Sequence, residues 1–272
     1  MQYYLVALLG SPLELLTYQS DTLLEIGMQV SITLSKREMR GVVIDGVDKP
    51  DFKTESILEV FPFFFSHAQI KMAQFMAEYY GCSLGEALNL CVPFERMESP
   101  YSVRGELVKP QIALQAQGER IPIDIILSSV QNEALNFIRS HPVSLLFGDT
   151  GAGKSEIYMK RMDEILSEGK RALLLLPEIS LTPQMEERFK RHFGELFVLW
   201  HSKMTPKQKK ITLAKIYDGS ARIIAGPRSA LFLPLKDLGV IVVDEEHDES
   251  YKSSSRPRYH ARDMAMLRRK LL

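Results

Sequence analysis

Cysteines, long apolar runs and N-terminal basic charge are all scarce in this 272-residue sequence. Its two cysteines, Cys82 and Cys91, are too few for a disulfide framework and do not form the Cys-x-x-Cys spacing of a metal clip. No apolar stretch approaches the roughly 18–20 residues that a bilayer span requires. Residues 1–4 also lack the basic charge that begins a signal peptide. These absences predict a cytoplasmic protein with no membrane partner and no zinc site in this chain.

The net charge of zero conceals an asymmetry between the two halves of the chain. Residues 1–128 carry 10 Lys/Arg and 16 Asp/Glu, whereas residues 129–272 carry 24 and 18. Basic residues gather at 203–215 and 252–270. Solvated helix faces would explain such runs, and so would an acidic partner such as nucleic acid. Both explanations stay open at this point.

The first hundred residues have the pattern of strands followed by helices. The alternation of apolar and polar residues predicts strands over 3–9, 28–34, 41–46 and 57–61. Helical spacing follows over 66–81, where Ser66 can cap the first turn, and over 83–90. Residues 99–122 contain three prolines and little periodicity, which is typical of a linker. We therefore expect a small β-rich domain over residues 1–98, joined to the rest by a linker over 99–122.

Residues 123–272 alternate buried strands with helices, which predicts a second domain. The expected strands are 143–147, 171–176, 197–200, 221–225 and 239–243, and the expected helices are 153–168, 182–193 and 206–217. Strands that are apolar on both faces and separated by helices form mostly parallel sheets, so the fold class is α/β. Ligands of such sheets bind at the carboxyl ends of the strands.

A phosphate-binding loop follows the first of these expected strands. The pattern Gly-x-x-x-x-Gly-Lys-Ser is complete in Gly148, Asp149, Thr150, Gly151, Ala152, Gly153, Lys154 and Ser155. Glycines allow backbone N–H groups to surround phosphates, and the helix that follows adds the positive end of its dipole. Lys154 is expected to reach the β- and γ-phosphates of a nucleotide, and Ser155 to bind Mg²⁺.

A pair of carboxylates ends the last expected strand. Asp244 and Glu245 follow the apolar run 238–243, so the strand delivers them to the sheet edge where the phosphate loop is expected. Asp244 is predicted to hold Mg²⁺ together with Ser155, and Glu245 to orient or deprotonate the attacking water. With Lys154, these two residues are the candidate catalytic groups of an enzyme that hydrolyses a nucleoside triphosphate.

Five blocks in order carry a closer resemblance. They are 148–156, 175–184, 226–232, the sequence Asp-Glu-Glu-His-Asp at 244–248, and 250–263. Together they resemble the PriA family of superfamily 2 helicases. The resemblance implies a P-loop, RecA-like lobe of an ATP-dependent 3′-to-5′ DNA helicase that recognises stalled replication forks and initiates primosome assembly for replication restart.

The resemblance also implies roles for particular residues. His247 would link the nucleotide site to the DNA site, and Gln131 would read the adenine, although a plain helix-surface glutamine is the alternative. The expected DNA-contacting residues are Ser180, Thr182, Arg228 and Ser229 after two strands, and Tyr251, Lys252, Arg258 and Tyr259 in an aromatic-rich loop. For the first four, ordinary strand-to-helix turns are the alternative.

The first hundred residues resemble the family's domain for the 3′ end of a DNA strand more loosely. Of the aromatic-Asp-Tyr triplet usual in its pocket, only Tyr18 is present, and Thr17 stands in place of the carboxylate. Residues 77–86 fit the family better. The implied partners are branched and single-stranded DNA at forks, primosome proteins and single-strand-binding proteins.

The family's second motor lobe and its paired Cys-x-x-Cys zinc sites do not follow in this sequence. We therefore expect a shortened chain that unwinds DNA weakly or not at all, with zinc bound only by the downstream part of the family. Two other functions stay open: a non-catalytic scaffold that binds forks and loads a helicase, and another superfamily 2 DNA translocase.

Overall fold

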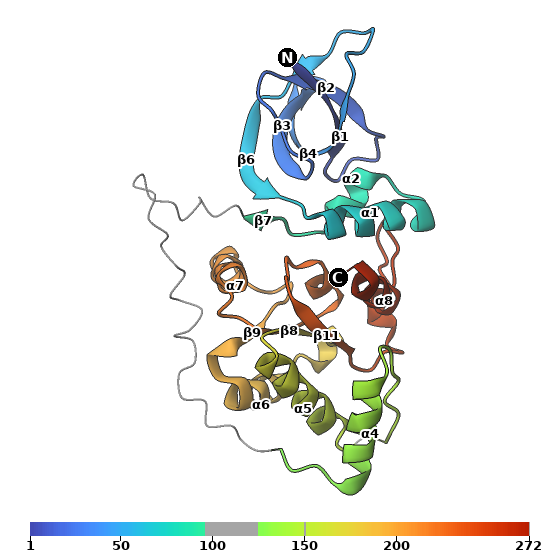
Figure 1. The fold of residues 1–272 in the computed structure, drawn as a ribbon, viewed down its shortest axis with the longest axis vertical. Coiled ribbons are helices and arrows are strands. Elements are labelled where there is room, and N and C mark those ends of the chain that lie inside the picture. Colours follow the sequence, from blue (N-terminus) through green and yellow to red (C-terminus); the bar gives the residue numbers. More distant parts are fainter. Residues whose placement is uncertain (96–124, 150, 272) are drawn as a thin grey trace. The chain divides into compact units, whose positions relative to one another are not determined.

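The computed structural model describes residues 1–95, 125–149 and 151–271, so the expected linker at 99–122 lies outside the described residues (Figure 1). By their internal contacts the described residues form two compact units. The first combines residues 1–95 with 232–234 and 252–271, and the second contains 125–149, 151–231 and 235–251. The expected fold class is confirmed: a mixed N-terminal sheet is followed by a parallel sheet with helices.

The first unit is built on a seven-stranded sheet in the order β5-β2-β1-β4-β3-β6-β7. Its strands are β1 (Gln2–Leu8), β2 (Leu16–Ser20), β3 (Met28–Leu34), β4 (Arg37–Val47), β5 (Glu55–Ser56), β6 (Glu59–Phe64) and β7 (Phe94–Glu95). All neighbours pair antiparallel except β2 and β5, which are parallel. One face buries a core of Tyr4, Val6, Leu8, Tyr18, Leu24, Val30, Ile32 and Val43.

Two capped helices lie between β6 and β7 in the chain. Helix α1 (His67–Tyr80) begins with a capping box in which the Ser66 hydroxyl accepts from the Gln69 N–H, and it ends at Gly81 in the left-handed conformation. Helix α2 (Leu84–Leu88) repeats the device with Ser83 and Glu86. The expected cap at Ser66 is confirmed, because both partners of the box are in place.

The segment 252–271 belongs with these helices by its contacts. Helix α8 (Ala261–Leu271) contacts α1, and the buried Arg268 on α8 donates to the Leu233 carbonyl at 3.0 Å. Arg256 donates to the Gly81 carbonyl at 2.7 Å, and the His260 N–H donates to the Tyr80 hydroxyl at 3.3 Å. Part of the range expected to form the second domain is thus built into the first unit.

The second unit contains a four-stranded parallel sheet in the order β11-β8-β10-β9. The strands are β8 (Arg171–Leu175), β9 (Phe197–Leu199), β10 (Ile223–Gly226) and β11 (Leu238–Val243). The helices are α4 (Ser129–Ser140), α5 (Lys154–Ser167), α6 (Pro183–Phe193) and α7 (Pro206–Asp218). In Figure 1, α5 and α6 lie on one side of the sheet and α7 on the other.

This placement follows from right-handed crossovers, because the connection from β8 to β9 and the return to β10 run in opposite directions across the sheet. The core between α5, α6 and the sheet includes Met162, Leu174 and Phe189, which are almost fully buried. No helix in the described part of the chain combines the length and the apolar character needed to cross a membrane.

The strand expected at 143–147 is not present, and that expectation was wrong. These residues have no regular secondary structure, and Val143, Leu145 and Phe147 are 58%, 72% and 91% exposed. A short segment forms a strand only when a neighbour satisfies its N–H and C=O groups. Among the described residues, β11 is at the sheet edge and does not pair with this segment.

Gly85 gives a test of the first unit's packing. A Cβ atom at this position would lie 1.9 Å from the carbonyl oxygen of Leu8, so α2 would have to move away from β1. We expect Gly85→Ala to lower the free energy of unfolding by about 1–3 kcal/mol, measured by thermal unfolding. Gly46→Ala is the matched control, because nothing lies within 4 Å of its Cβ. Equal midpoints for the two variants would contradict this packing.

Candidate functional site

The phosphate-loop residues lead directly into the first turn of α5. Gly151 and Gly153 have φ angles of +85° and +79°, which glycine adopts at low cost. Gly153 is the N-cap of α5 and supplies no side-chain acceptor, so the first N–H groups of the helix are left for a ligand. Thr150, another predicted member of the loop, lies outside the described residues.

The Lys154 ammonium lies within the curve of this loop. Its Nζ atom donates to the carbonyl oxygens of Gly148 at 2.7 Å and Asp149 at 3.2 Å. The side chain therefore turns back over the loop instead of extending into solvent. The arrangement places one positive charge among the backbone groups where phosphate oxygens are expected.

Three side chains meet where α5 begins and β11 ends. The Tyr158 hydroxyl lies 3.2 Å from Ser155 Oγ and 3.2 Å from Asp244 Oδ2. The Asp244 N–H donates to the Leu175 carbonyl at 3.0 Å, which continues the pairing of β11 with β8 past the last strand residue. The structure thus brings together the two residues predicted to bind Mg²⁺.

The Asp244 carboxyl is partly desolvated. Burial raises its pKa above the ordinary value, and the charge of Glu245 adds to the rise. The hydrogen bond from Tyr158 and the charge of Lys154 act in the opposite direction. The net effect is a raised pKa, which means that the folded protein disfavours the ionised carboxylate. A bound cation would stabilise that ionised form.

Glu245 and His247 occupy the exposed turn after Asp244. Glu245 has a φ angle of +47°, an unusual conformation for a residue with a side chain, and its N–H donates to Asp244 Oδ1 at 3.1 Å. His247 Nε2 lies 3.7 Å from the Glu245 carboxylate. Both side chains face solvent, with exposed fractions of 76% for His247 and 49% for Glu245.

Gln131 lies against the phosphate loop. Its Nε2 atom donates to the Gly153 carbonyl at 3.4 Å, while its Oε1 atom accepts from the Ser128 N–H at 2.8 Å as part of the α4 capping box. Helix α4 therefore places the glutamine beside the phosphate loop. Its role in reading adenine stays a prediction.

The residues predicted to contact DNA after β8 and β10 lie at one sheet edge, because these strands are parallel neighbours. Thr182 is the N-cap of α6 and accepts from the Met185 N–H at 3.2 Å, and Ser180 ends the preceding turn. Ser229 is exposed, whereas Arg228 is half-buried and donates to the Ser250 carbonyl. Thr182 and Ser229 are therefore the more accessible of the four.

The three tyrosines predicted to contact DNA are all buried. Tyr251 is 0% exposed and its hydroxyl donates to the Asp244 carbonyl at 2.6 Å. Tyr259 is 3% exposed and meets the Phe232 ring edge-on at 5.0 Å, and the Tyr18 hydroxyl donates to the Thr33 carbonyl at 3.1 Å. In this structure no ring of the three is open to a nucleobase, whereas Lys252 and Arg258 are exposed.

Two functional contacts were missed by sequence reasoning. Tyr158 lies three residues after Ser155, a helical spacing that places both on one face of α5 and could have indicated their contact. The bond from Tyr251 to the backbone of Asp244 carries no such signal, because it depends on how the chain turns after β11. Together they tie the candidate site to two buried phenols.

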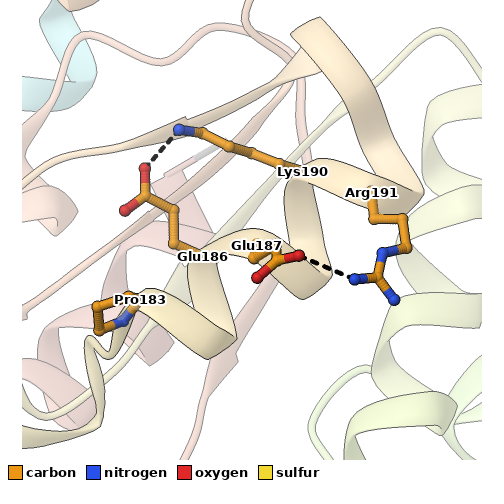
Figure 2. A pocket seen from close by; sticks show the side chains of 5 residues that line it. All are labelled: Pro183, Glu186, Glu187, Lys190 and Arg191. Atoms are coloured by element: carbon orange, nitrogen blue, oxygen red, sulfur yellow. Dashed lines mark hydrogen bonds and ion pairs between the residues drawn. The ribbon is translucent and has the colours of Figure 1, made fainter.

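A hollow on the surface of α6 is separate from these groups (Figure 2). It is lined by Pro183, Glu186, Glu187, Lys190 and Arg191. Lys190 pairs with Glu186 at 2.6 Å and Arg191 with Glu187 at 2.9 Å, both across one helical turn. Such exposed pairs contribute little to stability, and the hollow contains no phosphate-loop residue.

Two family models match the chain. Residues 128–270 match the DEAD/DEAH box helicase model, and residues 6–93 match the 3'DNA-binding domain (3'BD) model. The first match spans more than half of the sequence and includes the phosphate loop and Asp244. The chain therefore belongs to the DEAD/DEAH box helicase family.

Similar curated proteins carry the name Replication restart protein PriA. The protein from Helicobacter pylori (strain ATCC 700392 / 26695) is 44% identical over 98% of this chain and 40% of its own length. The protein from Rickettsia felis is 34% identical over 94% of this chain and 39% of its own length. That from Bacillus subtilis is 47% identical over 47% of this chain and 16% of its own length. These matches confirm the resemblance to PriA carried by the five sequence blocks.

Asp244 gives a test of the electrostatics of the site. Because folding raises the pKa of its carboxyl, the ionised form destabilises the folded state above that pKa, and the penalty is absent below the pKa of the unfolded chain. We expect Asp244→Asn to raise the unfolding midpoint by a few degrees near neutral pH and to lose this advantage at strongly acidic pH. Asp51→Asn, at an exposed carboxylate, is the control. A lower midpoint for Asp244→Asn at neutral pH would contradict the assignment.

Proposed function

We propose that this chain is the DNA-binding and ATP-binding part of a 3′-to-5′ DNA helicase that recognises stalled replication forks and begins primosome assembly. One observation supports nucleotide binding above all: Ser155 and Asp244 both contact the Tyr158 hydroxyl, next to Lys154. The match to the 3'DNA-binding domain supports the DNA-binding half. The chain spans about 40% of the Helicobacter pylori relative, so unwinding and restart are proposed for the whole protein.

The donor chemistry of the site fits Mg²⁺. The hydroxyl of Ser155 and the carboxylate of Asp244 are hard oxygen donors of the kind that this ion prefers, and both lie near the same phenol. When bound, Mg²⁺ would neutralise charge on the phosphate oxygens of ATP. Lys154 holds the phosphates, the N–H groups at the start of α5 surround them, and Glu245 orients or deprotonates the attacking water.

The DNA contacts are proposed on both units. Thr182, Ser180 and Ser229 would meet a strand at the edge where β8 and β10 end, with Arg228 positioned behind them by the Ser250 carbonyl. Lys252 and Arg258 are exposed and add positive charge. His247, beside Glu245, would link the nucleotide to the DNA. Branched and single-stranded DNA, primosome proteins and single-strand-binding proteins are the proposed partners, in the bacterial cytoplasm.

Lys154→Ala tests the nucleotide assignment. Removal of a charge aimed at the phosphates should weaken binding of Mg²⁺-ATP about tenfold or more, measured by calorimetry. Lys203→Ala removes an exposed lysine elsewhere in the same unit and should bind as the wild type does. Nucleotide binding that is unchanged in Lys154→Ala would remove the basis for an ATP-driven motor.

A paired substitution tests the DNA surface. Lys252→Ala with Arg258→Ala should reduce the salt dependence of single-stranded DNA binding, because each lost phosphate contact lowers the log–log slope by about 0.7. Fluorescence anisotropy over a salt series gives the slopes. Lys49→Ala with Lys53→Ala removes two exposed charges from the acidic first half and serves as the control. A larger slope change in the control than in the test pair would show that the basic half does not form the binding surface.

A further inference from the structure

Tyr158 lies in the middle of the nucleotide site, although none of the site motifs includes it. It is on the second turn of α5, is 8% exposed, and its ring stacks near Phe189 with 6.4 Å between centroids. Its hydroxyl is directed away from this apolar contact, toward Ser155 and Asp244 at 3.2 Å each. The ring is thus fixed by the core of the second unit while its one polar atom faces the two predicted Mg²⁺ ligands.

The donor of each of these two hydrogen bonds follows from the number of protons that each group can donate. A phenol has one proton to donate, and an ionised carboxylate can only accept. Tyr158 therefore donates to Asp244 Oδ2, and the Ser155 hydroxyl donates to the phenol oxygen. This order leaves the lone pairs of Ser155 Oγ open to a cation.

Asp244 is held from two further sides. Its N–H donates to the Leu175 carbonyl at 3.0 Å, and its own carbonyl accepts from the Tyr251 hydroxyl at 2.6 Å. The backbone position is therefore fixed by β8 and by Tyr251. The rotation of the carboxylate is then set by one contact on each oxygen: the Glu245 N–H donates to Oδ1 at 3.1 Å, and the Tyr158 hydroxyl of α5 lies 3.2 Å from Oδ2.

We propose that Tyr158 is a positioning residue for Mg²⁺, whose hydroxyl orients the Ser155 hydroxyl and the Asp244 carboxylate toward one ion. The proposal rests on the proposed ATP-binding function and adds to it the group that arranges the two ligands. Outer partners of metal ligands typically change metal affinity by about 10–100-fold when removed. A tyrosine that only fills the core would not affect the Mg²⁺ requirement.

Tyr158→Phe in the 272-residue chain tests this role, because it removes the hydroxyl and keeps the ring. Binding of a fluorescent ADP analogue is titrated with Mg²⁺ and, separately, measured in EDTA. We expect the Mg²⁺ midpoint to rise about tenfold, with nucleotide affinity in EDTA unchanged. Tyr4→Phe is the matched control: it also removes a buried phenol hydroxyl, one that accepts from the Leu24 N–H at 2.9 Å in the first unit. Its Mg²⁺ midpoint should equal that of the wild type.

Asp244→Asn separates positioning from general support of the fold. If Tyr158 acts through Asp244, adding Tyr158→Phe to Asp244→Asn should shift the Mg²⁺ midpoint less than about twofold further. Tyr158→Leu, which also lacks the hydroxyl, repeats the test if the Phe variant does not fold, and thermal unfolding of each variant reports folding. A wild-type Mg²⁺ midpoint in folded Tyr158→Phe would overturn the proposal alone. A wild-type chain that binds no nucleotide at any Mg²⁺ concentration would overturn the proposed function as well.

Discussion

The parallel pairing of β11 with β8 is the constraint on which the candidate nucleotide site depends. The register runs to Val243 opposite Leu175, and the Asp244 N–H then continues it by donating to the Leu175 carbonyl at 3.0 Å. This last bond holds the carboxylate at the carboxyl end of the sheet, beside the first turn of α5. A shift of one residue in this register would turn the Asp244 side chain to the opposite face, away from Ser155 and Tyr158.

The site also combines groups that do not favour folding on their own. Asp244 is a partly buried carboxylate next to Glu245, and Glu245 takes a backbone conformation that costs free energy for a residue with a Cβ. The hydrogen bond from Tyr158 and the charge of Lys154 oppose the rise in the Asp244 pKa. Strain and desolvation concentrated at one sheet edge are typical of sites that gain stability when a ligand arrives.

Much of this arrangement could be predicted from the sequence because its signals are local. The phosphate-loop pattern, the capping residue Ser66 and the apolar strands are defined by neighbouring residues. The segment 143–147 was predicted wrongly, because apolar character shows a tendency to be buried and does not show whether a strand partner is present. The burial of Tyr251 and Tyr259 could not be predicted from the sequence either, because an aromatic ring in a loop can stack on a nucleobase or pack into the core.

The first unit is discontinuous in sequence, and this has a consequence for how the chain is made. Its sheet and first two helices come from residues 1–95, yet α8 and the turn before it come from residues 252–271. On a ribosome the strands can pair early, whereas the surface of α1 that contacts α8 has to wait until the whole second unit has been synthesised. The first unit can therefore be completed only after the second unit has been synthesised, because the contacts between α1 and α8 join residues that are far apart in the sequence.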